Sequence, residues 1–460
     1  MSQKVDIFHI VCYTLFTKSI GGFVITELER LFAEKRTENG DIAYNTTGDD
    51  LLDILFMTEY YQKHLDEAKD KIGKTDVDKL FAMFVRDPRL GLGRRDLGRV
   101  LMDGAEVDMS SVIKAGRYDD LFYLTNQIAK GLEVYSYLWS KVLQGDELAK
   151  KWMPRFNTKD DGVAKQICKN LGISQKTYRK AIKANTVENK LSTHKEEEIV
   201  YEQVPSLAMI KYYQRFLKDP RFNKYLESVK KGESKLNVAT TTVYDIYRNR
   251  DTIDADLFFD KLAKIKINCI PILDTSGSMW DNNDSIGKAI SIAYYLAKCS
   301  TYCNNQVVSF SSNPQLIKIA EKSCGNSLCR FGSSNKFSRE LNSMYTGDCS
   351  NTDFGAVIKL LGQLNEFPDY FVVLSDMEFD YGSSVEKDSV MLSLKERGVK
   401  TKIVWWNFNS RGTTAPEMDK YGNIFLSGYS PMLLKYLENG FNGKQFLVKL
   451  LQEYERNITN

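Results

Sequence analysis

Histidine and cysteine are scarce in this chain of 460 residues, and their scarcity restricts the chemistry that it can perform. The three histidines, His9, His64 and His194, lie far apart, and the eight cysteines include no Cys-x-x-Cys pair. Because zinc sites are built from such clusters, we do not expect a zinc centre. Reduced, mostly buried thiols in a cytosolic protein are the simpler interpretation of the cysteines.

Recognisable signatures of catalysis are missing as well. With so few histidines, no Ser-His or Cys-His arrangement can be read from the sequence. No predicted strand is followed by a Gly-x-x-x-x-Gly-Lys-Ser/Thr or Gly-x-Gly-x-x-Gly loop that would hold a phosphate. We therefore expect a protein that is not an enzyme.

Long hydrophobic runs are also absent, since no uninterrupted apolar stretch approaches the roughly 18 residues that a membrane span needs. Residues 7–16 imitate a secretion signal, but Asp6, His9 and Lys18 interrupt the pattern. We predict an amphipathic helix there and a soluble, cytoplasmic protein without a membrane partner. With 43% hydrophobic residues, 9 prolines and 29 glycines, the chain is neither collagen-like nor largely disordered.

The charge of the whole chain indicates no class of partner, because 63 Lys and Arg stand against 60 Asp and Glu. The basic residues are nevertheless concentrated in one place. Residues 150–190 hold 11 basic and 3 acidic side chains, a net charge of +8. A surface that binds nucleic acid would therefore have to come from local clustering of this kind.

The first part of the chain, residues 1–250, is predicted to be a domain of helical repeats. Its apolar residues recur at helical spacing between short breakers, which is typical of stacked helix pairs in a HEAT-like solenoid. The sequence shows no clean fixed period, so a plain helical bundle is the alternative. The predicted helices are Leu51–Leu65, Val77–Val85, Tyr118–Ile128, Leu132–Val142, Val163–Leu171 and Leu207–Leu217. Residues 251–264 are predicted to connect this domain to the next one.

From residue 265 to residue 460, apolar strands alternate with helices. The predicted strands are Lys266–Leu273, Val307–Ser311, Leu316–Ile319, Tyr370–Leu374, Lys402–Phe408 and Ile424–Leu426. The predicted helices are Ile286–Lys298, Phe354–Leu364, Ser389–Arg397, Pro431–Leu437 and Phe446–Tyr454. This alternation predicts a doubly wound, Rossmann-like α/β domain in which helices cover both faces of a mostly parallel sheet.

The strongest local motif, Asp274-Thr275-Ser276-Gly277-Ser278, follows the first of these strands. It presents a carboxylate and two hydroxyls at the end of a strand, where α/β sheets bind their ligands. Such hard oxygen donors suit Mg²⁺ or Mn²⁺. The alternative interpretation is an ordinary turn, because Asp and Ser often cap helices.

Two further residues are placed to complete a metal site. Thr352 precedes a predicted helix and Asp376 ends a later strand, so both are expected to face the same crevice. Glu378 and Asp380 add negative charge beside them, and we interpret these two as solvated or capping groups and not as metal ligands.

The chain resembles known families at several motifs. Asp274, Ser276, Ser278, Thr352 and Asp376 resemble the metal-ion-dependent adhesion site (MIDAS) of von Willebrand factor A domains. Other segments are similar to a Ro-like family of plant, fungal and viral proteins of unknown function. These segments are Arg86–Arg95, Gly116–Leu121, Ala149–Pro154, Asn351–Phe354 and Ser375–Asp380.

The resemblance implies the architecture of the Ro ribonucleoprotein, in which a helical TROVE module is joined to a von Willebrand factor A domain. It implies a non-catalytic scaffold in the cytoplasm, or in the host cytoplasm for a viral protein, that binds small noncoding or misfolded RNA. An alternative is a protein-interaction or structural module in which Mg²⁺ captures an acidic side chain of a partner, without RNA. A metal-dependent nuclease is a third hypothesis, but a hydroxyl-rich site favours capture of an acidic group over activation of water.

Two basic clusters are the candidate RNA contacts. Lys176, Arg179, Lys180 and Lys183 recur at spacings of three and four around Tyr178, and Arg94, Arg95 and Arg99 form the second cluster. Basic side chains neutralise phosphates, and aromatic rings stack on unpaired bases. The alternative is that both clusters are solvated helix faces with the aromatic residues in the core.

Overall fold

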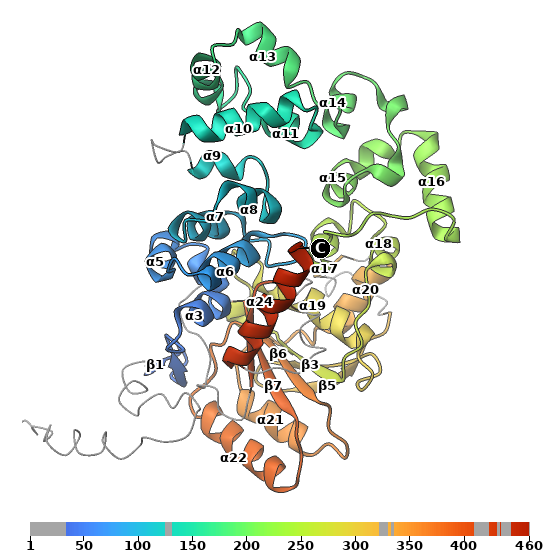
Figure 1. Ribbon diagram of the computed structural model, residues 1–460. Helices are drawn as coiled ribbons and strands as arrows, with labels where there is room; N and C mark the ends of the chain where they lie inside the picture. The colour runs from blue at the N-terminus through green and yellow to red at the C-terminus, as the bar shows by residue number, and fades with distance from the viewer. Residues whose placement is uncertain are drawn as a thin grey trace, which may run out of the picture.

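The computed structural model describes residues 34–124, 131–321, 330–332, 335–408, 423–429, 433 and 443–459. Within them, a helical first half is followed by a region built on a mixed sheet (Figure 1), as the sequence predicts. The amphipathic helix predicted over residues 7–16 lies outside the described residues, as does most of the helix predicted at Pro431–Leu437.

The described chain begins with a β-hairpin, so the first half is not all-helical as predicted. Strands β1 (Glu34–Arg36) and β2 (Ile42–Tyr44) pair in antiparallel register. They are joined by a short turn, residues 37–41, that closes with a hydrogen bond from the N–H of Thr37 to the carbonyl of Asp41 at 3.0 Å. We call these five residues the hairpin turn.

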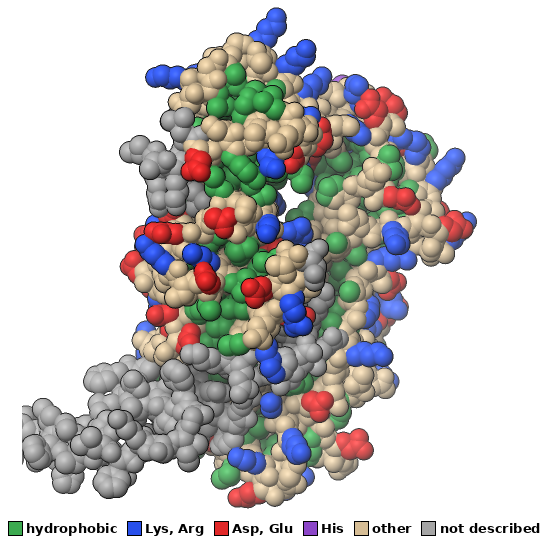
Figure 2. Space-filling model, viewed as in Figure 1, with side chains coloured by type: hydrophobic (Ala, Val, Ile, Leu, Met, Phe, Trp, Pro, Cys, Tyr) green, Lys and Arg blue, Asp and Glu red, His purple; other side chains and the backbone are tan. Residues whose placement is uncertain are grey.

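Short helices then follow one another in an arc (Figure 1). They are α3 (Asp50–Phe56), α4 (Thr58–Tyr61), α5 (Leu65–Lys71), α6 (Asp76–Arg86), α7 (Arg95–Gly104), α8 (Met109–Ala115), α9 (Asp120–Leu124), α10 (Gly131–Leu143), α11 (Glu147–Trp152), α12 (Asp161–Asn170), α13 (Gln175–Ala181), α14 (Val187–Ser192), α15 (Ser206–Phe216), α16 (Pro220–Lys231), α17 (Val243–Asn249) and α18 (Ala255–Lys261). Two 3₁₀ turns, Glu196–Glu198 and Tyr201–Gln203, lie between α14 and α15. The arc leaves the sheet region through α5 to α8 and returns to it through α17 and α18, and in the space-filling view a gap remains inside it (Figure 2).

Two sequence predictions in this half need correction. The connector predicted at 251–264 contains α18, so helices continue almost to the first strand of the sheet. The single helix predicted over Leu51–Leu65 is wrong, because it is divided into α3, α4 and α5. The first break occurs at Met57, next to Thr58, whose hydroxyl donates to the carbonyls of Ile54 and Leu55 and competes with the helical backbone bonds.

The second half is built on a six-stranded sheet with the order β5-β4-β3-β6-β7-β8. Its strands are β3 (Cys269–Asp274), β4 (Gln306–Phe310), β5 (Gln315–Lys318), β6 (Tyr370–Ser375), β7 (Lys402–Asn407) and β8 (Ile424–Ser427). All neighbours are parallel except β4 and β5. The four central strands β3, β4, β6 and β7 are almost wholly buried, which explains why they read as continuous apolar runs.

Helices cover both faces of this sheet. They are α19 (Ser285–Cys299), α20 (Lys336–Ser343), α21 (Phe354–Gly362), α22 (Ser383–Glu396) and α24 (Gly443–Thr459). Right-handed crossovers place α19 on one face and α21 and α22 on the other, since β4 and β6 lie on opposite sides of β3. Trp405 of β7 packs against Phe354 of α21, with ring centroids 5.2 Å apart.

The last helix joins the two halves. Tyr454 of α24 is buried, its ring lies 5.5 Å from that of Phe84 in α6, and its hydroxyl donates to Asp87 at 3.3 Å. Helix α24 therefore packs on the helical half as well as on the sheet region (Figure 1). No helix in the described part of the chain has the length and apolar character needed to cross a membrane.

Candidate functional site

The candidate site lies where the two middle strands of the sheet end. Strand β3 ends at Asp274 and its parallel neighbour β6 ends at Ser375, followed by Asp376, with Leu273 paired to Leu374. From β3 the chain proceeds first to β4 and β5 on one side, and later to β6, β7 and β8 on the other. The carboxyl ends of the neighbouring strands β3 and β6 thus form the topological switch point, where open α/β sheets bind ligands.

Asp274 is fully buried at this point. Its carboxylate accepts hydrogen bonds from the N–H of Ser276 at 2.9 Å and from the hydroxyl of Ser375 at 2.5 Å. Burial and the negative charge of Asp376 raise the pKa of Asp274 to about 7, against the effect of these hydrogen bonds. Among the described residues Asp274 forms no ion pair, so its charge is not neutralised by a basic side chain of this part of the chain.

The two serines of the motif lie together beside Asp274. A 3₁₀ turn, Gly277–Met279, brings the hydroxyl oxygens of Ser276 and Ser278 to 3.3 Å from each other. Ser276 is buried and Ser278 half-buried, so this side of the site opens toward solvent. Thr275 fixes the loop, because its N–H donates to the carbonyl of Phe310 at the end of β4 at 2.8 Å.

Thr352 is buried between the ends of β4 and β6. The next residue, Asp353, donates its N–H to the carbonyl of Ser311 at 3.2 Å, and its side chain caps α21. The carbonyl of Thr352 accepts the N–H of Asp380 at 3.0 Å, which ties it to the segment that follows Asp376. The structure therefore brings all five predicted metal-site residues to one edge of the sheet.

Glu378 and Asp380, predicted to be solvated or capping groups, have distinct places. Glu378 is buried, and its carboxylate accepts the N–H of Glu38 in the hairpin turn at 2.7 Å, so it caps that turn. Asp380 is half-buried, and burial raises its pKa, although a hydrogen bond from the backbone of Thr352 opposes the rise. Ser375, which supports Asp274, was not predicted, although it stands beside Asp376 in the quoted motif.

The donor set fits a hard divalent cation. Two carboxylates and three hydroxyls offer only oxygen atoms, which Mg²⁺ and Mn²⁺ prefer to softer ligands. A cation at this edge would also neutralise the buried charge of Asp274, which otherwise favours protonation. Within the described residues, no group of three or more His, Cys, Asp and Glu side chains is arranged to hold a metal ion, and this site, with two carboxylates, is not of that type.

Two family models match parts of the chain. Residues 140–267 match a domain of unknown function, DUF2828, and residues 268–457 match another, DUF7788. The division between the two matches falls one residue before β3.

A viral protein is similar over most of the length. The uncharacterized protein L728 of Acanthamoeba polyphaga mimivirus is 23% identical over 512 residues, covering 92% of this chain and 88% of that protein. Among solved structures, the Ro (RSR) protein of Deinococcus radiodurans is matched at a TM-score of 0.33 and 12% identity, over 86% of this chain and 77% of that one.

The predicted RNA contacts Arg94, Arg95 and Arg99 lie in an ionic network of the helical half. Arg94 pairs with Glu59, which also binds Lys288 of α19 at 3.2 Å. Arg95 pairs with Asp119, and Arg99 binds Asp119 at 3.0 Å and Asp120 at 2.6 Å. These ion pairs neutralise the three arginines within the fold, so the arginines do not support the predicted RNA surface.

The other cluster has a different environment. Lys176, Arg179, Lys180 and Lys183 are all exposed, and no ion pair joins them to a described residue. Helix α13 ends at Ala181, so Lys183 lies beyond the predicted helix face. Lys and Arg side chains project from this end of the arc in Figure 2.

Tyr178, the aromatic residue of this cluster, is a core residue and not a stacking platform. It is fully buried, its hydroxyl donates to the carbonyl of Pro154 at 2.7 Å, and its ring stacks on Trp139 at 5.8 Å. Tyr178 therefore belongs to the core, whereas the basic side chains of α13 face solvent, where a phosphate backbone could reach them.

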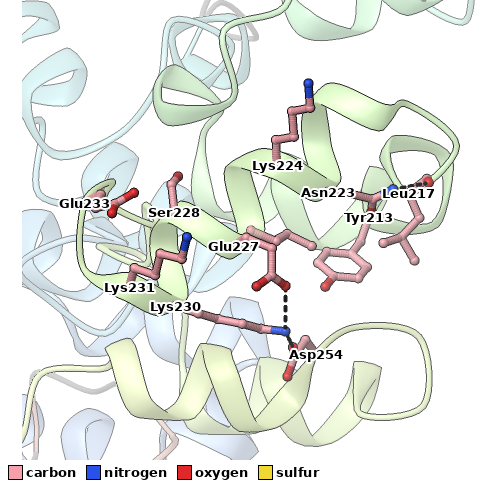
Figure 3. Close-up of a pocket in the computed structure, with 11 residues that line it drawn as sticks. Tyr213, Leu217, Asn223, Lys224, Glu227, Ser228, Lys230, Lys231, Glu233 and Asp254 are labelled. Carbon is pink, nitrogen blue, oxygen red and sulfur yellow. Dashed lines mark hydrogen bonds and ion pairs between the residues drawn. The ribbon is translucent and has the colours of Figure 1, made fainter.

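An open groove between α16 and α18, with a volume of about 740 Å³, is a separate feature (Figure 3). Lys230 crosses it from Glu227 at 3.7 Å to Asp254 at 3.5 Å. Tyr213 of α15 also lines the groove, and burial raises the pKa of Tyr213 to about 12. Acidic and basic side chains are mixed here, so the groove favours no single kind of ligand.

Proposed function

We propose that this protein is a non-catalytic, RNA-binding scaffold whose second half is a von Willebrand factor A-like domain with a divalent-cation adhesion site. One observation carries the proposal. Asp274 ends β3 and Asp376 directly follows the neighbouring strand β6 at the switch point of the sheet, beside the hydroxyls of Ser276 and Ser278. This position and these oxygen donors support a Mg²⁺ or Mn²⁺ site.

In this proposal Asp274, Ser276 and Ser278 bind the cation directly, and Thr352 and Asp376 bind it directly or through water. When bound, the cation offers an open coordination position to an acidic group from outside. The protein's own contribution is to hold the donors in place. Ser375 fixes the carboxylate of Asp274, and the bond between Thr275 and Phe310 fixes the serine loop.

The absence of turnover is inferred from the donor set. Hydroxyl ligands donate little negative charge to a cation, which leaves it suited to capture a carboxylate or a phosphate. A general base beside the cation would assist the activation of water, but Glu378, the nearest acidic residue in the chain after Asp376, is directed to the hairpin turn.

RNA binding is assigned to the exposed basic residues of α13. They are free of ion pairs with the described residues and belong to the segment with a net charge of +8. Positive side chains of this kind bind the phosphate backbone and confer a salt dependence on affinity. The second candidate function is a protein-interaction module without RNA, and it is favoured by the same adhesion site because that site accepts a partner's carboxylate.

The metal site is tested by titrating Mn²⁺ into chelator-treated, full-length protein and following the free ion by electron paramagnetic resonance. We expect the wild type to bind one ion, Asp274→Ala to abolish binding and Ser278→Ala to weaken it. Ser309→Ala is the matched control, because Ser309 is a buried hydroxyl of β4 without a hydrogen-bond partner among the described residues. Equal affinity in Asp274→Ala and wild type would overturn the metal site.

RNA binding is tested with a labelled stem-loop RNA that carries a single-stranded end. The triple variant Lys176→Glu, Arg179→Glu, Lys180→Glu should bind about tenfold or more weakly and show a shallower salt dependence. The triple variant Lys218→Glu, Lys224→Glu, Lys231→Glu changes the net charge equally at exposed positions elsewhere, and should bind nearly as the wild type. Equal losses would contradict a site on α13. Mg²⁺-dependent cleavage of the RNA would contradict the non-catalytic assignment.

A further inference from the structure

The hairpin turn, residues 37–41, forms hydrogen bonds with the segment that follows Asp376. The hydroxyl of Thr37 donates to the carbonyl of Phe379 at 2.8 Å, and both groups are buried. The side chain of Asn39 donates to the carbonyl of Glu378 at 2.8 Å. These contacts join residues that are about 340 positions apart in the sequence.

Asp41 makes a further buried contact. Its carboxylate accepts both the N–H of Ser384 at 2.9 Å and the hydroxyl of the same serine at 2.8 Å. Asp41 is 2% exposed, and Ser384 lies in the first turn of α22. The acid that caps α22 therefore comes from the other half of the molecule and not from the residues before the helix.

The segment held in this way adjoins two of the five metal-site residues, Asp376 and Thr352. It begins directly after Asp376, and its Asp380 donates to the carbonyl of Thr352. Met377, between them, has a φ of +65°, a left-handed conformation that a residue with a side chain adopts only when its surroundings enforce it. The hairpin turn supplies such enforcement, because it bonds to Glu378, Phe379, Tyr381 and Ser384.

We propose that the hairpin turn is a clamp that positions Asp376 and Thr352 for the divalent cation, with Asp41 as its principal positioning residue. The inference rests on the proposed adhesion site. Asp41 does not bind the cation in this account. It fixes the start of α22, and through the residues 377–383 it fixes the acid and the threonine at the edge of the sheet.

The clamp also connects the site to the helical half. The hairpin leads directly into α3, whose Asp53 is held by the hydroxyls of Thr46 and Thr47 at 2.6 and 2.7 Å. Movement of α3 would therefore be transmitted to the metal-site segment through a short, hydrogen-bonded piece of chain.

The test compares Asp41→Ala with Asp41→Asn in the full-length protein. Asparagine retains an acceptor for the N–H of Ser384 and a polar group for its hydroxyl, whereas alanine retains neither. Asp108→Ala is the matched control, since the carboxylate of Asp108 likewise accepts an N–H and a hydroxyl from Ser110 and caps α8, far from the sheet. Each variant is measured for Mn²⁺ affinity and for amide hydrogen exchange of residues 378–384 in metal-free buffer.

We expect Asp41→Ala to bind Mn²⁺ about tenfold more weakly, at the lower end of the effect of losing a supporting contact at a metal site. It should also lose amide protection over residues 378–384, while Asp41→Asn retains most of both and Asp108→Ala all of both. Unchanged Mn²⁺ affinity in Asp41→Ala, with or without lost protection, would overturn the clamp alone. Failure of the wild type to bind Mn²⁺ would overturn the adhesion site and the clamp with it.

Discussion

Asp120 in the helical half and Asp274 at the edge of the sheet are both buried acids, but their surroundings differ. Asp120 lies between Arg86 at 2.7 Å and Arg99 at 2.6 Å. Asp274 lies near Asp376, and its pKa is raised to about 7. The chain neutralises the first acid itself and leaves the second to a proton or an external cation. The source of the counter-charge thus separates a structural acid from a candidate ligand.

The largest expected effect is on the structural side of this comparison. Arg86→Met should lower the free energy of unfolding by about 3 kcal/mol, because it leaves Asp120 buried with one guanidinium fewer. Urea denaturation measures the change. Arg339→Met removes the exposed pair with Glu321 and should change stability by less than about 0.5 kcal/mol. Equal changes in unfolding free energy for Arg86→Met and Arg339→Met would show that Asp120 does not depend on its buried ion pair.

Replacing the buried acid at the sheet edge is expected to raise the free energy of unfolding, where replacing Arg86 lowers it. Asp274→Asn should stabilise the metal-free protein at pH 8 by about 2 kcal/mol. Removing the buried charge is worth about 4 kcal/mol for a pKa raised from 3.8 to about 7. The amide gives back about half of this, because it has one acceptor oxygen for the two hydrogen bonds from Ser276 and Ser375. The folded-state pKa is raised, so the metal-free wild type binds more protons when folded and loses stability as pH rises from about 4 to about 7. Asp274→Asn should lack this loss.

Thermal unfolding between pH 5 and pH 8, in chelator, measures this difference. Excess Mg²⁺ should restore the stability of the wild type at pH 8 and leave Asp274→Asn unchanged, because a bound ligand stabilises only the state that binds it. A metal-free Asp274→Asn protein that is less stable than wild type at pH 8 would show that the raised pKa is wrong.

An exposed acid of the helical half should show the reverse dependence on pH. Burial of Asp108 opposes its ionisation, but hydrogen bonds from Ser111 and Ser110 outweigh it and lower the pKa of Asp108 to about 2. Asp108→Ala should cost about 1 kcal/mol at pH 7, as for other helix caps. Because the folded pKa is lowered, this difference should be complete above about pH 4 and shrink as pH falls toward 2. A difference that is constant between pH 2 and pH 7 would contradict it.

The sheet region was largely predictable from sequence, and the reason is local. Each central strand is buried on both faces and therefore reads as an apolar run, as in Tyr370–Ser375, with its site residue at the end. The order of strands then places Asp274 beside Asp376 without further information. What the sequence could not supply is the support of these residues by Ser375 and by the hairpin turn.

Contacts between distant residues account for the failures. The hairpin strands have no apolar alternation to reveal them, and the turn between them is held by bonds to residues 378–384. Helix α22 begins at Ser383, six residues before the predicted start, and Asp41 caps its first turn. Arg95 and Arg99 looked like an RNA contact because their partner, Asp119, lies 20 or more positions away.

The smallest expected effect concerns the basic residues of α13, and it completes the comparison with the ionic network. Lys176 and Lys180 are exposed and form no ion pair with a described residue, so the double variant Lys176→Glu, Lys180→Glu removes no contact. A negative charge is favourable in the first turn of a helix and unfavourable in the last, and the two effects nearly cancel. We expect a change in unfolding free energy below about 0.5 kcal/mol.

Arg99→Glu is the comparison variant. It reverses only one charge, but it places a carboxylate beside Asp119 and Asp120, so it should destabilise the protein far more. If the α13 variant were destabilised as strongly, its lysines would be structural, and reduced RNA affinity in the triple variant would have to be attributed to misfolding.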